Sequence, residues 1–239
     1  MAIPHKVCPA PRSTPGAGGR QCTPECALPP DVLREASRRL GIMSLIGAAL
    51  WLAGTTLGHL SARAAGDGGA PWTTLSWIDG IAAISIAVSL ALFAYTRRSE
   101  REPGIILDLG LVYLVLTAFA LGMMIHLAPP PAGWRIMPEI SWIGAVVLMF
   151  AAVVPNAPRK MSVAVLIAVS MNPLSMLLAR ARGVWDFGAA SNVLLMHYPD
   201  YLLAGVAVVI SQVVTKLGQQ VTRARDLGSY ELGELLGRG

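Results

Sequence analysis

Residues 105–127 read IILDLGLVYLVLTAFALGMMIHL, an almost unbroken apolar run that begins after Pro103-Gly104 and stops just before Pro129. A helix of this length rises about 35 Å, enough to cross the roughly 30 Å hydrocarbon core of a membrane. The run lacks the strict alternation of a barrel strand, and a helix satisfies its own backbone hydrogen bonds in lipid. The stretch therefore predicts a transmembrane helix with sharp ends.

Similar apolar runs recur along the chain. They occupy residues 42–60, 77–95, 105–127, 140–154, 161–179 and 201–217. The composition agrees, since 54% of the 239 residues are hydrophobic, 14% are charged and the mean hydropathy is +0.56. Soluble domains have about 25% charged residues. We expect an all-α, polytopic membrane protein with a domain of six transmembrane helices over residues 42–217.

The basic residues predict the orientation, because Lys and Arg beside the spans are retained on the cytoplasmic side. Six spans put both termini on one side, and placing that side inside leaves four of the 19 basic residues outside: Arg63, Arg135, Arg180 and Arg182. We expect a multi-pass protein of the inner (plasma) membrane with both termini in the cytoplasm. Its expected partner is the lipid bilayer, whose anionic headgroups match the net charge of +5, so no nucleic acid is required.

Residues 1–30 are a Pro/Gly-rich segment that we expect to be a cytosolic tail. The tail contains all three cysteines and one histidine: His5, Cys8, Cys22 and Cys26. Thiolate and imidazole are ligands of tetrahedral zinc, and a reducing compartment disfavours disulfides, so these four residues predict a zinc site. The Cys-x3-Cys spacing is looser than that of common zinc knuckles, and reduced cysteines in an unfolded tail are the alternative.

Residues 31–41 follow with a helical pattern. Leu33, Ala36 and Leu40 share one side of it, and arginines lie on the other. The pattern predicts a juxtamembrane helix at the inner membrane surface, and a plain extension of the first span is the alternative.

Three histidines map to the predicted outer ends of spans one, three and six: His59, His126 and His197. Imidazole binds metal or haem and changes charge near neutral pH, so these residues would form a sensor site if the fold brought them together. Interfacial placement of amphipathic rings is the alternative.

Other polar residues within the spans have structural explanations. Asp79 and Asp108 lie near the starts of spans two and three, where helix capping accounts for a carboxylate better than proton transport does. Asn172-Pro173 in span five predicts a kink, because proline removes an intrahelical hydrogen bond.

The exit from span six connects the membrane domain to the C-terminal residues. Apolar residues continue at heptad-like spacing into a linker over residues 218–229: Ile210, Val214, Leu217, Val221 and Ala224. This pattern predicts a signalling helix, continuous with span six, that pairs in a homodimer. A basic amphipathic linker resting on lipid is the alternative, and Gly54-x3-Gly58 in span one is a second place where helices can approach closely.

The last ten residues read Tyr230-Glu-Leu-Gly-Glu-Leu-Leu-Gly-Arg-Gly239. A strand-competent run followed by Gly-x-Gly resembles the start of a protein-kinase domain, in which a strand leads into the glycine-rich loop over ATP. The resemblance is to bacterial, eukaryotic-like serine/threonine kinases with several membrane spans before the catalytic domain. Gly237 and Gly239 match the first two glycines of G-x-G-x-x-G-x-V, whose backbone closes over the phosphates.

The resemblance implies a function that the complete protein would perform. The third loop glycine, the strand lysine, H-R-D and D-F-G would all follow Gly239, so we expect no catalytic residue within residues 1–239. The complete protein would use ATP and magnesium to phosphorylate Ser or Thr on itself and on other protein substrates. The six spans would then be its sensor and anchor.

Two other functions fit six spans. A small transporter or channel would depend on polar residues inside the membrane for flux. The membrane domain of another signalling enzyme, such as a nucleotide cyclase, also precedes a cytosolic catalytic region, although residues 230–239 do not resemble the start of a cyclase.

Overall fold

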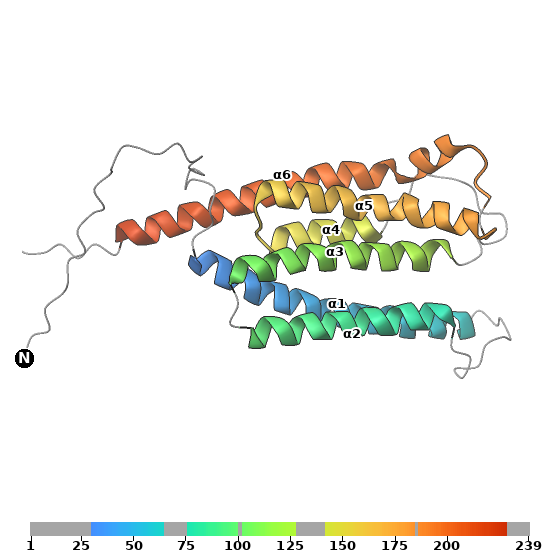
Figure 1. Cartoon of the computed structure of the whole chain (residues 1–239), viewed down its shortest axis with the longest axis horizontal. Coiled ribbons are helices and arrows are strands. Elements are labelled where there is room, and N and C mark those ends of the chain that lie inside the picture. The colour runs from blue at the N-terminus through green and yellow to red at the C-terminus, as the bar shows by residue number, and fades with distance from the viewer. Residues whose placement is uncertain (1–29, 65–75, 100–101, 128–141, 185, 229–239) are drawn as a thin grey trace, which may run out of the picture.

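The computed structural model describes residues 30–64, 76–99, 102–127, 142–184 and 186–228. The regular secondary structure in these ranges is entirely α-helical, which confirms the all-α part of the predicted fold class. The six helices are α1 (Pro30–Ala64), α2 (Trp77–Arg98), α3 (Pro103–His126), α4 (Trp142–Val153), α5 (Pro158–Ala181) and α6 (Ala190–Gly228). They lie side by side along the long axis of the molecule (Figure 1).

Five of these helices are long and apolar enough to cross a membrane: α1, α2, α3, α5 and α6. The remaining helix, α4, has 12 residues. At about 1.5 Å per residue it rises roughly 18 Å, less than the roughly 30 Å of the hydrocarbon core. The predicted fourth span, residues 140–154, is therefore an apolar helix that is too short to cross by itself within the described residues.

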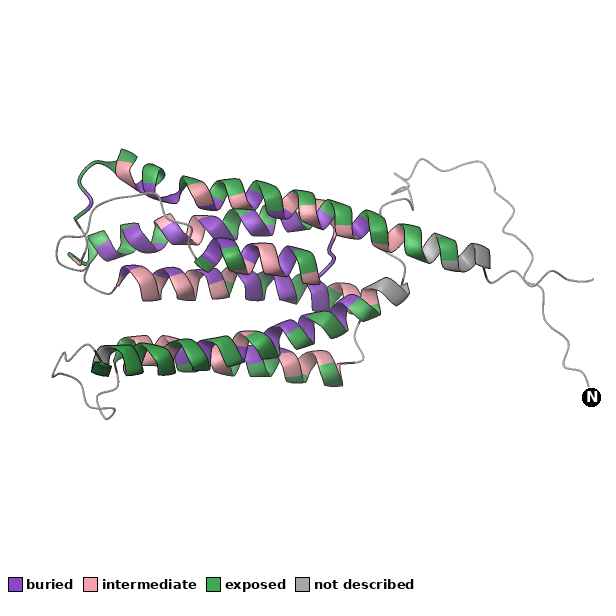
Figure 2. Ribbon diagram, turned by 180° about the vertical axis from the view of Figure 1, so that it is seen from behind, coloured by how far each residue is buried: buried purple, intermediate pink, exposed green. Residues whose placement is uncertain are grey.

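Large apolar side chains cover the outside of the helices. Leu194, Ile84 and Leu202 are 68%, 66% and 64% exposed, and exposed positions follow the outward sides of the helices (Figure 2). Soluble monomers rarely present apolar surface on this scale, whereas lipid hydrocarbon solvates it. The chain is accordingly a multi-pass membrane protein.

The helices pack in two groups, with α1 and α2 in one group and α3, α4, α5 and α6 in the other. Helix α1 packs against α2, α3 packs against α5, and α6 lies along both α4 and α5. Gly122 permits a close approach of α3 to α5, since a Cβ atom there would lie 2.6 Å from Ser175 Oγ and 3.1 Å from the Met171 carbonyl oxygen. Small residues at such crossings let two membrane helices gain contact along their backbones.

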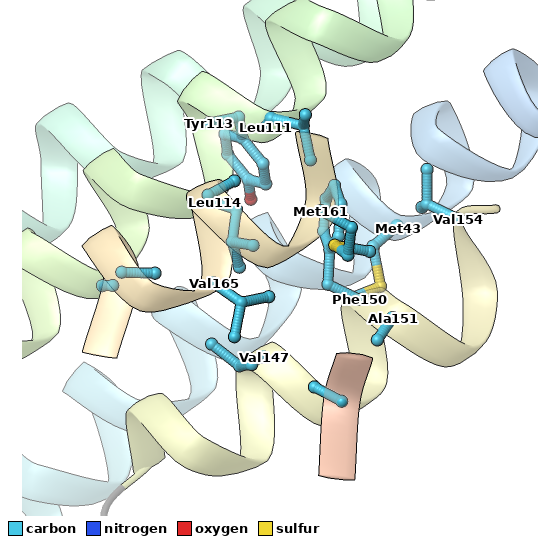
Figure 3. Close-up of a cluster of buried hydrophobic side chains, with 14 of the residues drawn as sticks. Met43, Leu111, Tyr113, Leu114, Val147, Phe150, Ala151, Val154, Met161 and Val165 are labelled. Atoms are coloured by element: carbon cyan, nitrogen blue, oxygen red, sulfur yellow. The ribbon is translucent and has the colours of Figure 1, made fainter. Parts of the chain in front are cut away.

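The short helix α4 supplies much of the core. Val147 and Phe150 are 0% and 1% exposed. They lie among side chains from α1, α3 and α5, including Met43, Leu114 and Val165 (Figure 3). This side of α4 contacts protein instead of lipid, which explains why so short a helix is so apolar.

Helix α1 joins two segments that the sequence pattern separates. Residues 31–41 and the first span form one helix of 35 residues. Ala36 and Leu40 are fully buried in the bundle core, so they contact protein and not the membrane surface. Gly110 lets Leu40 pack against α3, because a Cβ atom at Gly110 would lie 2.7 Å from Leu40 Cδ2.

Helix α6 likewise joins the sixth span to residues 218–228 in one helix of 39 residues. It begins at Ala190, well before the start that the apolar run predicts at residue 201. Part of the segment between the predicted spans five and six is therefore helical, and this extension carries the polar residues described next.

Candidate functional site: a buried polar cluster

Four polar side chains meet inside the bundle, and we call them the polar cluster. They are His126 at the end of α3, Asn172 of α5, and His197 and Asp200 of α6. Their exposures are 1%, 4%, 2% and 0%. Buried polar groups are costly unless they are hydrogen-bonded, so the contacts among these four side chains determine whether the site is stable.

Asn172 is the centre of the polar cluster. His126 Nε2 lies 2.8 Å from Asn172 Oδ1, and Asn172 Nδ2 donates to Asp200 Oδ2 at 2.7 Å. His197 Nε2 lies 3.4 Å from His126 Nε2, and the two rings meet at 62° with centroids 5.5 Å apart. His197 Nδ1 donates to the Val193 carbonyl oxygen at 2.7 Å. The cluster thus joins three helices through one amide side chain.

The hydrogen bonds of the polar cluster run in one direction. Because the Asp200 carboxylate accepts from the Asn172 amide nitrogen, the Asn172 oxygen faces His126, whose Nε2–H donates to it. His197 uses Nδ1–H on a carbonyl oxygen, so in a neutral ring its Nε2 is an acceptor facing the same His126 N–H. A proton added to His197 Nε2, or a cation placed between the two histidines, would therefore face the N–H of His126, which already points toward it.

Two prolines adjoin the polar cluster. Pro173 follows Asn172 inside α5, and Pro199 precedes Asp200 inside α6. Each proline lacks the N–H that would bond to the preceding turn, so each helix loses a backbone hydrogen bond at this level. The position of Pro173 within α5 agrees with the sequence prediction. The turns that hold the cluster are therefore those at which α5 and α6 are least constrained by their own backbones.

A fourth helix approaches Asp200. A Cβ atom added at Gly144, in the first turn of α4, would lie 3.3 Å from Asp200 Oδ1 and 2.5 Å from Leu203 Cδ1. Glycine therefore lets the backbone of α4 come close to the carboxylate. The amino end of a helix carries a partial positive charge, which favours a carboxylate at this position.

His59 is not a member of the polar cluster. Its Nε2 lies 2.8 Å from Asp79 Oδ1, between α1 and α2. Asp79 also accepts from the Ser76 N–H at 2.8 Å and completes a capping box at the start of α2. The predicted capping role of Asp79 is confirmed, and the fold brings together only two of the three outer-end histidines.

Asp108 has a partner other than the one expected. Both of its carboxylate oxygens accept from Lys160 Nζ, at 2.6 and 2.7 Å, and this ion pair joins α3 to α5. The expectation that Asp108 caps a helix is wrong, because it lies beyond the first turn of α3 and faces a cation across the helix crossing.

Gly54 and Gly58, which were predicted to permit close helix packing, do not contact another described helix. A Cβ atom at Gly54 or Gly58 would meet no atom of the described chain within 4 Å. Gly54 lines an apolar cavity of about 500 Å³ between α1, α3 and α4. No described helix of the same chain therefore uses this surface.

The remaining predicted site residues lie outside the described ranges. These are the zinc ligands His5, Cys8, Cys22 and Cys26 and the ATP-loop glycines Gly237 and Gly239. Within residues that the structure describes, no three or more His, Cys, Asp or Glu side chains are placed to hold a metal ion. His126 contacts both His197 and Asn172, whereas His59 pairs with Asp79, so the three histidines do not form a metal-binding trio.

Sequence analysis missed Asp200, because the predicted span began one residue later, and it named Asn172 only for a kink. A signal for Asp200 does exist. Buried positions on α6 recur every three or four residues on both sides of Pro199: Val193, Met196, His197, Asp200, Ala204, Ala207, Ser211 and Thr215. Val193 and Met196 precede Pro199 at the same helical spacing as Ala204 and Ala207 follow it, so these apolar residues in the sequence indicate a helix that starts earlier than the purely apolar run.

Comparison of the chain with protein-family models, with curated proteins and with solved structures found no match.

Proposed function

We propose that this chain is the membrane sensor and anchor region of a receptor-type serine/threonine protein kinase. One observation carries the proposal: α6 continues without interruption from the polar cluster to Gly228, immediately before the segment that resembles the start of a kinase domain. From Asp200 to Gly228 this helix is roughly 40 Å long at about 1.5 Å per residue. A stiff element of this kind can carry a displacement from the membrane to a domain outside it.

The polar cluster is the part of the membrane domain suited to control α6. It ties α6 to α5 through Asn172 and Asp200, and to α3 through the two histidines. Because packed interfaces have discrete arrangements, a stimulus that rearranges these bonds would shift α6 between positions. The proline-containing turns are where such a shift meets least backbone resistance.

The far end of α6 fits the predicted homodimer. Leu217 and Val221 are 54% and 55% exposed, and they continue the heptad-like stripe beyond the buried core. Two copies of this helix would bury these side chains against each other and bring two kinase domains together for mutual phosphorylation. In the proposed orientation both termini are cytoplasmic, where the kinase domain would find ATP and magnesium.

The first test is to read the coding DNA beyond the codon for Gly239. A third loop glycine, a strand lysine, H-R-D and D-F-G in frame would support the kinase proposal. A different catalytic domain, such as a cyclase, would overturn it while preserving a signalling role. Absence of any such domain would leave the membrane helices as the functional unit.

The second test asks whether the polar cluster controls activity. In the complete protein, Asn172→Ala should change basal autophosphorylation several-fold, because α6 loses its tie to α5 and α3. Ser162→Ala is the matched control on α5, since the hydroxyl of the half-buried Ser162 donates to the Pro158 carbonyl of the same helix. Equal autophosphorylation by both variants and the wild type would contradict a role for the cluster in signalling.

The second candidate function is a small transporter or channel. The observation that favours it is the burial of Asp200, His126 and His197 within spans, where ionisable groups are costly and often mark an ion path. Proteoliposomes containing the chain should then show proton or cation flux that Asp200→Asn abolishes. Flux indistinguishable from that of empty liposomes would exclude this function.

A further inference from the structure

A second polar site lies at the opposite end of the bundle from the polar cluster. It is a cavity of about 600 Å³ between the start of α1, the end of α2 and the start of α3. Its polar lining includes three arginines, two serines and a threonine: Arg34, Arg38, Arg97, Ser37, Ser99 and Thr96. We call this cavity the arginine pocket.

The three arginines concentrate positive charge around one space. Arg34 and Arg38 are four residues apart on α1, where like charges repel, and Arg97 faces the same cavity from α2. None of the three forms an ion pair with another described residue, whereas the neighbouring Arg39 does so with Glu35 at 3.1 Å. An anion between the three guanidinium groups would remove the repulsion and accept several charge-assisted hydrogen bonds.

The helix ends at the arginine pocket contribute charge of both signs. Helix α3 begins there at Pro103, and its preceding residue Glu102 makes no side-chain capping bond. The positive end of α3 adds to the attraction for an anion. Glu102 and the carboxyl end of α2 oppose it, so the pocket should select a strongly charged group such as a phosphate over a weakly charged one.

The surface next to the arginine pocket is apolar and faces lipid. Ile42 lies one turn beyond Arg38 on the same side of α1 and is 44% exposed, and Ile105 lies on α3 beside the pocket and is 49% exposed. A ligand whose phosphate enters the pocket could therefore lay hydrocarbon chains along these side chains. A phospholipid has this combination of groups, and a free phosphate does not.

We propose that the arginine pocket binds the phosphate headgroup of an anionic phospholipid at the cytoplasmic face of the membrane. Basic pockets between membrane helices bind such headgroups through several arginine contacts and their fixed geometry. The bound lipid would hold the ends of α1, α2 and α3 together where no described carboxylate forms an ion pair with the three arginines. This inference does not depend on the presence of a kinase domain.

Native mass spectrometry of residues 1–239 in detergent tests the proposal, with phosphatidylglycerol and phosphatidylcholine as the two lipid probes. The variant R38Q/R97Q removes two charges from the pocket, and R39Q/R98Q removes two charges from the adjacent positions of the same two helices, which do not line it. Retention of phosphatidylglycerol should fall about tenfold or more in R38Q/R97Q and stay near the wild-type value in R39Q/R98Q. The zwitterionic phosphatidylcholine should be retained weakly by all three proteins.

Equal loss of phosphatidylglycerol in the two double variants would overturn the proposal, because general surface charge would then explain retention. Inorganic phosphate is the third probe, and its binding to the pocket without retained lipid would overturn the lipid as the ligand. If R38Q/R97Q fails to fold, R38K/R97K keeps the charge and removes the guanidinium fork. Reduced retention by this lysine variant supports the proposal, and unchanged retention contradicts the arginine geometry.

Discussion

Replacement of Asn172 by alanine is the most direct test of the fold around the polar cluster. The substitution removes the acceptor for His126 Nε2–H and the donor for Asp200 Oδ2. Both partners remain buried, at 1% and 0% exposure, so water does not replace the lost bonds readily. The variant should therefore be less stable than the wild type while keeping its helix content.

The magnitude follows from two lost hydrogen bonds in a membrane protein. Bonds between membrane helices contribute about 0.6 kcal/mol each on average and up to about 1.7 kcal/mol, so Asn172→Ala should lower the free energy of unfolding by about 1–3 kcal/mol.

Equilibrium unfolding in mixed micelles, followed by far-UV circular dichroism, measures this difference. Ser162→Ala provides the control on the same helix and should change the free energy of unfolding by less than about 0.5 kcal/mol, since the Ser162 hydroxyl bonds within its own helix, to the Pro158 carbonyl. A double-mutant cycle of Asn172→Ala with His126→Ala should give a coupling of about 0.6–1.7 kcal/mol. If Asn172→Ala is as stable as Ser162→Ala, or if the coupling is zero, the described hydrogen bonds do not hold α3, α5 and α6 together.

Three further predictions concern the α3–α5 contact, the ion pair between Lys160 and Asp108, and the orientation of the chain in the membrane. Gly122→Val should destabilise the fold by about 1–3 kcal/mol, because the added atoms overlap Ser175. Gly58→Ala should be neutral or stabilising by up to about 1 kcal/mol, because a Cβ atom there meets no described atom within 4 Å. The same unfolding assay measures both variants, and equal effects would contradict the α3–α5 contact. Lys160→Gln should lower the free energy of unfolding by less than about 1 kcal/mol, because the ion pair with Asp108 is half exposed. If added salt does not reduce this loss, the ion pair is not its cause. The three native cysteines should react with a membrane-impermeant maleimide only after cells are permeabilised, because the first thirty residues are proposed to be cytoplasmic, and labelling of intact cells would reverse the orientation.

Much of the architecture could be predicted from local patterns. The apolar runs identify the helices because a membrane-spanning helix must be apolar over a fixed length, and prolines mark several helix starts. Asp79 could be assigned to capping because its partner, Ser76, is only three residues away. Features that depend on neighbouring residues of one helix are therefore accessible without a tertiary structure.

The helix boundaries at both ends of the membrane domain could not be predicted in this way. An apolar run ends where polar residues begin, but a helix continues wherever those polar residues find partners. Ala36 and Leu40 extend α1 toward the N-terminus because they pack in the core, and Asp200 extends α6 because Asn172 bonds to it. The boundary of the apolar run and the boundary of the helix are thus different physical quantities.

The sequence by itself determined that this protein is a helical, multi-pass membrane protein, because helix length and apolar composition are properties of each segment alone. Only the tertiary structure decided which polar residues meet. His126 and Asn172 are 46 residues apart in the chain, and Asn172 and Asp200 are 28 apart, so no local period relates them. It likewise separated His59 from the other two histidines and gathered Arg34, Arg38 and Arg97 around one cavity. These sites arise from the packing of one helix on another, which depends on contacts among residues far apart in the chain.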